Sequence, residues 1–270
     1  MKKLLLFTII LFVSTPVFAT NKSSFQINFS DKSTVNLVAT PENDPESLFQ
    51  ATMALKSGDL YKALDLCNEA LNKQPDNPRI YNLRGNIKAG MNDIQGAFED
   101  YTMSILIQTD YPTPYYNRAN LYRDIGEYSK SISDYNTAIA LGGNLKIASY
   151  INRGFVKLSF MNDIDGALDD FTEAINLGAT DEGPYYGSAV CYYNKQMYNK
   201  TINYTVKAIT LSPKNPDAYA IQGQAKIKLN RIDEGLQDLK YAENQYKSDG
   251  NINKANEMNT LYQYYFNFYY

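Results

Sequence analysis

The sequence has 270 residues, of which 26 are lysine or arginine and 29 are aspartate or glutamate, so its formal net charge at neutral pH is −3. This charge disfavours nucleic acid as a partner, because binding to phosphates needs a dense basic face. The chain has no histidine and two cysteines, which excludes histidine-based catalytic triads and most zinc sites.

The first nineteen residues are typical of a secretory signal peptide. Lys2 and Lys3 precede an apolar run at 4–13, and the exit sequence Val-Phe-Ala ends at Ala19. The run is too short to cross a hydrocarbon core, which needs about 20 apolar residues. We therefore expect cleavage after Ala19 and export of the mature chain, which would be periplasmic or secreted.

Residues 20–43 form the next segment. Apolar and polar side chains alternate over 24–29 and 34–38, and this period of two is typical of β-strands. An isolated hairpin is only marginally stable in water. Two predictions therefore stand for this segment, a flexible leader and a short hairpin.

Six similar units follow, and their starts are 34 or 35 residues apart, a period typical of helix–turn–helix solenoids. Small residues recur in each unit where paired helices would approach closely. A unit alone would leave an apolar face in water, so the units are expected to stack. The expected units are 44–77, 78–111, 112–146, 147–181, 182–215 and 216–249. The small residues expected on the first helices are Ala51, Gly85, Ala119, Gly154, Ala189 and Gly223.

This spacing and these residue types resemble the tetratricopeptide repeat family, including Pro75 and Pro213 near the ends of two units. The resemblance covers 44–249. It implies an all-α, right-handed α-solenoid of six helix–turn–helix repeats, whose first helices line a concave groove that binds a protein segment. Residues 250–270 would then form an aromatic C-terminal capping helix.

The resemblance also implies which positions face the groove. Asn86 with Asn117, and Asn120 with Asn152, have the spacing of the paired asparagines in family members that hold peptide tails. An asparagine amide both donates and accepts, so a ladder of amides suits an extended backbone. The basic residues of that clamp are missing, so binding of a terminal carboxylate is not implied, and ordinary solvated helix positions are the alternative. The groove candidates are Asn82, Asn86, Tyr116, Asn117, Asn120, Ile151, Asn152, Phe155, Tyr186, Val190 and Tyr193.

Three arginines on the expected first helices recur with three aspartates on the second helices, 16 or 17 residues later. The first and fifth units lack both partners. This joint presence predicts structural ion pairs between helices, because an arginine fork binds a carboxylate with two parallel hydrogen bonds. An arginine ladder that binds a ligand is the alternative. The predicted pairs are Arg84 with Asp100, Arg118 with Asp134, and Arg153 with Asp170.

Lysines and cysteines give two further predictions. Lys88, Lys157 and Lys226 recur in every second unit. The favoured interpretation is that each lysine stem packs along its helix and its ammonium group reaches water. The alternative is that these lysines belong to a groove whose features repeat every two units.

Cys67 and Cys191 lie four units apart on inward helix faces. Because a disulfide needs Cα atoms within about 7 Å, we expect both to be free, buried thiols.

The last expected helix, from Ile252, ends with aromatic side chains on every face, more than one packing surface can bury. Capping is the favoured role, and contact with a partner or with a membrane surface is the alternative.

The favoured function is an exported adaptor or envelope assembly factor, which is an interaction scaffold that binds a protein segment in its groove without a metal or other cofactor. A purely structural subunit of an envelope complex, which docks through its convex face and its C-terminal helix, is the alternative. An enzyme is least expected, because the sequence contains no catalytic constellation.

Overall fold

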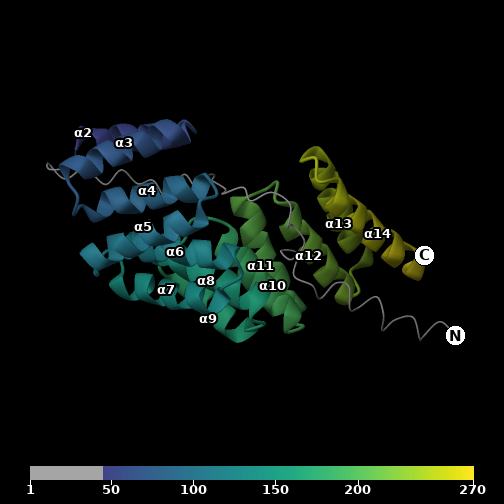
Figure 1. Cartoon of the computed structure of the whole chain (residues 1–270). Helices are drawn as coiled ribbons and strands as arrows, with labels where there is room; N and C mark the ends of the chain where they lie inside the picture. Colours follow the sequence, from purple (N-terminus) through teal and green to yellow (C-terminus); the bar gives the residue numbers. More distant parts are fainter. Residues whose placement is uncertain (1–44) are drawn as a thin grey trace. The chain divides into compact units, whose positions relative to one another are not determined.

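The computed structural model describes residues 45–270, and every regular element within that range is a helix (Figure 1). This confirms the predicted all-α solenoid class. The predicted signal peptide at 1–19 and the predicted leader at 20–43 lie outside the described residues. The helices are α2 (Glu46–Lys56), α3 (Leu60–Lys73), α4 (Pro78–Gly90), α5 (Ile94–Ile107), α6 (Pro112–Asp124), α7 (Tyr128–Leu141), α8 (Lys146–Phe160), α9 (Ile164–Asn176), α10 (Gly183–Asn194), α11 (Tyr198–Leu211), α12 (Pro216–Lys228), α13 (Ile232–Ser248) and α14 (Ile252–Tyr269).

Short turns join the helices in pairs, from repeat 1 (α2 and α3) to repeat 6 (α12 and α13). The chain forms two compact units: the first ends at Ser149 and the second begins at Tyr150, so the boundary falls within α8. In the first unit, α4 packs against α5 and also contacts α6 of the next repeat. In the second unit, α10 packs against α11 and also contacts α12. Within each unit, first helices of successive repeats therefore touch.

Small residues stand where the paired helices come closest. The set on the first helices, from Ala51 to Gly223, is buried throughout. A Cβ atom added to Gly85 would lie 2.6 Å from the Tyr101 ring, and one added to Gly223 would lie 2.7 Å from the carbonyl oxygen of Gly235. Larger side chains at these positions would force the paired helices apart.

The turn between the two helices of each repeat contains one residue in the left-handed conformation. Glycine adopts a positive φ angle without steric cost, whereas a residue with a Cβ atom adopts it at a cost of about 1–2 kcal/mol. Odd and even repeats differ in how they fill this position, mostly with glycine or with asparagine, which tolerates it best among the others. The residues are Gly58 (φ 83°), Asn92 (63°), Gly126 (84°), Asn162 (53°), Gln196 (58°) and Asn230 (63°).

The last helix, α14, packs against repeat 6 (Figure 1). Ala255, Met258 and Tyr262 belong to the apolar clusters that α12 and α13 form. Lys254 Nζ lies 3.1 Å from Asp217 Oδ1 of α12. These contacts cover apolar side chains of the last repeat, as a terminal cap of a repeat array does. Within residues 45–270, no helix has the length and apolar character needed to cross a membrane.

Cys67 and Cys191 are free and buried, as predicted. Burial raises the pKa of each thiol to about 12, although the nearby Arg84 and Lys195 act in the opposite direction. Neither thiol forms appreciable thiolate at neutral pH, so both behave as small apolar side chains.

Candidate protein-binding site

The predicted groove residues lie on the first helices α4, α6, α8 and α10, but three of them are buried. Their exposed fractions are 6% for Asn82, 3% for Tyr116 and 7% for Tyr186. The Tyr116 ring packs edge-on against Tyr135, with centroids 6.0 Å apart. The structure corrects the prediction for these three side chains. Burial of the Tyr116 and Tyr186 rings between helices removes more apolar surface from water than exposure in a groove would, and Asn82 accepts a hydrogen bond from Asn117.

Two asparagines hold tyrosine hydroxyls from the second helix of their own repeat. Asn86 Oδ1 accepts a hydrogen bond of 2.8 Å from the Tyr101 hydroxyl, and Asn120 Oδ1 accepts one from the Tyr135 hydroxyl. Both tyrosines are buried, so each hydroxyl needs an internal partner. Each amide oxygen therefore already accepts one hydrogen bond within its repeat. In Asn86 this leaves the Nδ2 donor and the second lone pair of the oxygen for a ligand.

Asn117 makes a contact between repeats. Its Nδ2 donates a hydrogen bond of 2.9 Å to Asn82 Oδ1, which joins the first helices α6 and α4. The buried Asn82 thus fixes the orientation of Asn117, and Tyr101 fixes the orientation of Asn86. Both Asn86 and Asn117 are half-buried, so the first unit presents two amides whose planes are set by internal hydrogen bonds.

In the second unit, aromatic contacts replace the amide and hydroxyl pair. Phe155 in α8 packs edge-on against Phe171 in α9, with centroids 4.9 Å apart. Tyr193 packs edge-on against Tyr198 at 5.5 Å, and its hydroxyl lies 3.4 Å from Gln224 Oε1. The first helices of this unit therefore offer rings where those of the first unit offer amides. The other half-buried candidates in this unit are Ile151, Asn152 and Val190.

The predicted arginines and aspartates lie together, and each arginine uses its fork. Nε and Nη2 donate to the two oxygens of one carboxylate, and the aspartate side chains are at most 9% exposed. A guanidinium held in this way uses its main hydrogen-bond donors within the protein, which favours the structural interpretation over a ligand-binding ladder. The two distances are 2.9 and 2.7 Å for Arg84 with Asp100, 2.7 and 3.0 Å for Arg118 with Asp134, and 2.9 and 2.5 Å for Arg153 with Asp170.

Two of these arginines also hold the preceding repeat. Arg84 Nη1 donates to Asn68 of α3 at 3.0 Å, and Arg118 Nη1 donates to Thr102 of α5 at 3.1 Å. Each guanidinium therefore joins its own first helix, its own second helix and the second helix of the repeat before.

The sequence did not lead us to predict that tyrosine rings stack against these arginines. In α4, α6 and α8, one tyrosine stacks with the arginine three residues later, with the guanidinium 5.3 to 5.9 Å from the ring centroid. Cation–π contacts of this kind add about 0.5–1 kcal/mol at exposed sites. Their recurrence every 34 or 35 residues was a usable signal in the sequence. The stacked tyrosines are Tyr81, Tyr115 and Tyr150.

The three recurrent lysines form ion pairs, which corrects the prediction that their ammonium groups reach water. Their side chains are 13 to 20% exposed. A carboxylate has about four lone-pair sites, and an arginine fork occupies two, so an ammonium group can bind to the same aspartate. The Nζ to Oδ2 distances are 2.8 Å for Lys88 with Asp100, 2.9 Å for Lys157 with Asp170, and 2.7 Å for Lys226 with Asp238.

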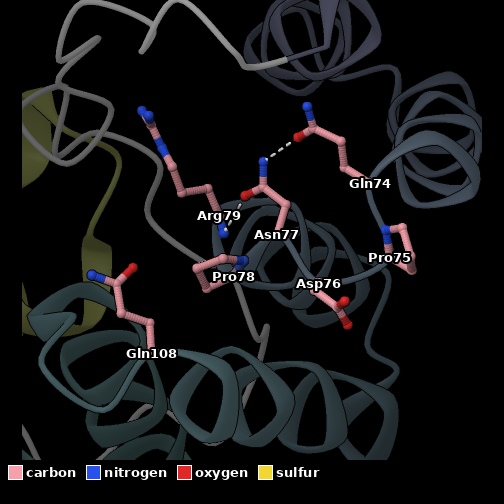
Figure 2. A pocket seen from close by; sticks show the side chains of 7 residues that line it. All are labelled: Gln74, Pro75, Asp76, Asn77, Pro78, Arg79 and Gln108. Carbon is pink, nitrogen blue, oxygen red and sulfur yellow. Dashed lines mark hydrogen bonds between the residues drawn. The ribbon is translucent and has the colours of Figure 1, made fainter.

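A depression lies at the loop between α3 and α4 (Figure 2). Residues 74–79 line it together with Gln108. Figure 2 shows Asn77 at its centre: Nδ2 donates to Gln74 Oε1 at 2.6 Å, and Oδ1 accepts from the Arg79 backbone N–H at 3.0 Å. Asn77 therefore caps α4 and fixes the loop.

Among residues 45–270, no cluster of three or more histidine, cysteine or carboxylate side chains is placed to hold a metal ion.

Comparisons with known proteins agree with this architecture. Residues 112–141 match the family profile described as tetratricopeptide repeat. The TPR repeat-containing protein MJ1428 of Methanocaldococcus jannaschii is 24% identical over 181 residues, which are 60% of this chain and 31% of that protein. This chain thus spans about a third of the length of that curated relative.

Two solved structures have the same fold at lower identity. YrrB, described as a TPR protein with an unusual peptide-binding site, superposes with a TM-score of 0.58 and 17% identity over 71% of this chain and 97% of that one. PilW, described as a widely conserved type IV pilus biogenesis factor, has a TM-score of 0.66 and 13% identity over 80% and 96%. At these identities the likeness concerns the fold alone.

Proposed function

Because the chain is a tetratricopeptide repeat protein, we propose that it is an exported interaction scaffold that holds an extended segment of a partner protein against its first helices. Proteins of this fold serve as protein–protein interaction scaffolds, and YrrB is described as having a peptide-binding site. The observation that carries the proposal is the pair of oriented amides at Asn86 and Asn117.

The two amides have complementary atoms for a backbone. Tyr101 engages the oxygen of Asn86, so Asn86 would bind a ligand through its Nδ2 donor. Asn82 engages the nitrogen of Asn117, so Asn117 would bind through its Oδ1 acceptor. A peptide backbone needs one acceptor for each N–H and one donor for each C=O.

The separation of the helices sets the spacing of the bound groups. Packed helices lie about 8–10 Å apart, and an extended chain advances about 3.3 Å per residue. Amides on α4 and α6 therefore suit backbone groups two or three residues apart. Since neither amide contacts a ligand side chain in this arrangement, the surface would accept many sequences in an extended conformation.

Export and envelope assembly are the finer parts of the proposal. The signal-peptide pattern of residues 1–19 supports export, and the description of PilW as a pilus biogenesis factor supports an assembly role. We propose no catalytic role and no cofactor for the scaffold. Intact-mass analysis after expression in a Gram-negative host tests export: a periplasmic or secreted chain that begins at Thr20 supports it, and a full-length cytoplasmic chain contradicts it.

Crosslinking and affinity capture from the envelope fraction test the binding surface. One bait carries Asn86→Ala with Tyr101→Phe, which removes the amide without leaving a buried hydroxyl unpaired, and a second carries Asn117→Ala. Two further baits keep both amides: Tyr101→Phe alone, which leaves the Asn86 amide free to rotate, and Asn203→Ala at an exposed position of α11, which is the control.

We expect the two amide baits to lose captured proteins that wild type and Asn203→Ala retain, and Tyr101→Phe alone to capture less than wild type. Equal capture by all five baits would contradict the amide surface and would favour the purely structural subunit, which has no need of these side chains. Circular dichroism spectra of the baits confirm that each variant is folded before the comparison is made.

A further inference from the structure

A charged pair follows the oriented amide of Asn117 along α6. Asp124 comes seven residues after Asn117, which is about two helical turns, so the two side chains lie on one face of the helix. The Asp124 carboxylate holds the guanidinium of Arg123 at this face, because Nε and Nη2 each lie 2.8 Å from Oδ1. The side chains of Arg123 and Asp124 are 32% and 33% exposed, so a ligand that lies against the first helices can reach them.

Arg123 has hydrogen-bond donors that the fold does not use. Its Nε and one Nη2 hydrogen face a single oxygen of Asp124. Arg84 and Arg118 differ, since each binds both oxygens of an aspartate and binds the preceding repeat through Nη1. Within residues 45–270, Asp124 is the only hydrogen-bond partner of the Arg123 guanidinium. Nη1 and the second Nη2 hydrogen therefore form an open end of the fork, a shape that binds a carboxylate with two parallel hydrogen bonds.

The guanidinium of Arg123 stays charged in this position. Burial acts to lower its pKa, but the nearby Tyr135 and Asp124 together act more strongly in the opposite direction, so the pKa is raised overall. The Tyr135 hydroxyl also donates to Asn120 Oδ1, and Asn120 neighbours Arg123 three residues later on the same helix. A ligand group at this place therefore meets a cation beside the amides of α6.

The charge of the first helices favours an acidic ligand group over a basic one. Three basic residues in α4 and two in α6 stand against one acidic residue, Asp124. The carboxylates that bind Arg84, Lys88 and Arg118 belong to the second helices. A basic side chain would meet only a carboxylate that Arg123 already holds, whereas an acidic side chain would meet unused donors.

We propose that Arg123 binds the carboxylate of an aspartate or glutamate side chain in the segment that the scaffold holds. This inference rests on the proposed function and adds a preference for acidic segments. A segment bonded to both Asn86 and Asn117 runs across α4 and α6, and Arg123 lies to its side, about 9 Å along α6 from Asn117. An acidic side chain and the arginine side chain together span this distance, whereas the backbone of the segment continues across the helices.

Retention of a peptide library by the immobilised protein tests the preference. The library contains short random peptides that are acetylated at the N-terminus and amidated at the C-terminus, so side chains supply its only carboxylates. Mass spectrometry identifies the retained peptides, and wild type is expected to enrich aspartate and glutamate. A retained peptide is then synthesised with glutamine in place of glutamate, and fluorescence anisotropy should show about tenfold weaker binding of the glutamine form.

Three variants assign the preference to Arg123. Arg123→Gln should bind the glutamate and glutamine forms equally. Asp124→Asn should increase the difference between the two forms, because it removes a competing carboxylate next to the guanidinium. Arg231→Gln should keep the wild-type difference and is the matched control, since it removes an exposed arginine that pairs with Glu234 in the second unit. A folding defect would weaken both forms alike, so the ratio of the two affinities reports the carboxylate contact.

Any of four results would overturn this role of Arg123. They are a wild type that does not enrich acidic residues, an Arg123→Gln variant that keeps the wild-type preference, an Asp124→Asn variant that loses it, and enrichment seen only with a second library that has free C-terminal carboxylates. If Asn117→Ala abolishes retention and wild type does not enrich acidic residues, the amide surface stands and only the role of Arg123 fails. If wild type retains no peptide, both fail.

Discussion

Replacement of Asn86 by alanine should destabilise the first unit by leaving a buried hydroxyl without its partner. Tyr101 is 3% exposed, and its hydroxyl donates to Asn86 Oδ1 at 2.8 Å. Burial raises the pKa of Tyr101 well above its usual range, so the hydroxyl stays protonated and needs an acceptor. A buried polar group that loses its partner costs about 1–3 kcal/mol, and we expect about 2 kcal/mol for Asn86→Ala.

A four-variant cycle separates this cost from the loss of the amide alone. Tyr101→Phe should cost about 1 kcal/mol, because the half-buried Asn86 oxygen can turn towards water. The double variant should cost about 1.5 kcal/mol, well below the sum, because both partners are then removed. Repeat 4 supports this expectation, since Phe155 and Phe171 pack as two apolar rings in the corresponding place.

Equilibrium unfolding in urea, followed by circular dichroism, measures the four free energies. Asn203→Ala, exposed on α11, is the control and should change stability by less than about 0.5 kcal/mol. If the two single costs add to the double cost within about 0.5 kcal/mol, the hydroxyl and the amide are independent and the reasoning fails.

Three further outcomes are expected. Gln196→Gly should raise stability by about 0.5–1 kcal/mol in urea unfolding, because glycine relieves the side-chain strain at φ 58°; a loss of stability would show that the glutamine side chain contributes more than the strain. Gly223→Ala should lower stability by about 1–3 kcal/mol, because the new Cβ atom would meet the backbone oxygen of Gly235, which cannot rotate away; an unchanged melting temperature would contradict this close approach. Cys67 and Cys191, whose pKa burial raises to about 12, should resist alkylation at pH 8 until the chain is unfolded, and rapid labelling of the folded chain, detected by mass spectrometry, would contradict their burial.

The repeat architecture was predictable because sterics constrain it at single positions. Only a small residue fits where Gly85 faces the Tyr101 ring. The close approach of the two helices therefore appears in the sequence as a small residue that recurs in each repeat. The arginine and aspartate pairs were predictable because repeats 2 to 4 contain both partners, whereas repeats 1 and 5 contain neither. The lysines were misjudged because Lys88 shares Asp100 with Arg84, and a cluster of three partners is not visible in pairwise spacings.

The candidate site was less predictable, because the side chains that face a groove depend on how each helix is rotated about its own axis. Tyr116 and Asn117 are neighbours in the sequence, yet one is buried against Tyr135 and the other is half-buried on the contact with α4. A resemblance by position does not fix that rotation. The 15-residue spacing of Asn86 with Tyr101 recurs one repeat later with Asn120 and Tyr135, and it could have revealed these hydrogen bonds.

The arginines that join three helices determine how the first unit should come apart. Arg84 and Arg118 each bind a carboxylate within their own repeat and a side chain of the repeat before. The stability of a linear array is the sum of terms for each repeat and terms for each junction, and these two side chains contribute to both. Under a pulling force or in the presence of a protease, repeats 1 to 3 should therefore unfold together as one cooperative unit. They should not unfold one repeat at a time from the end.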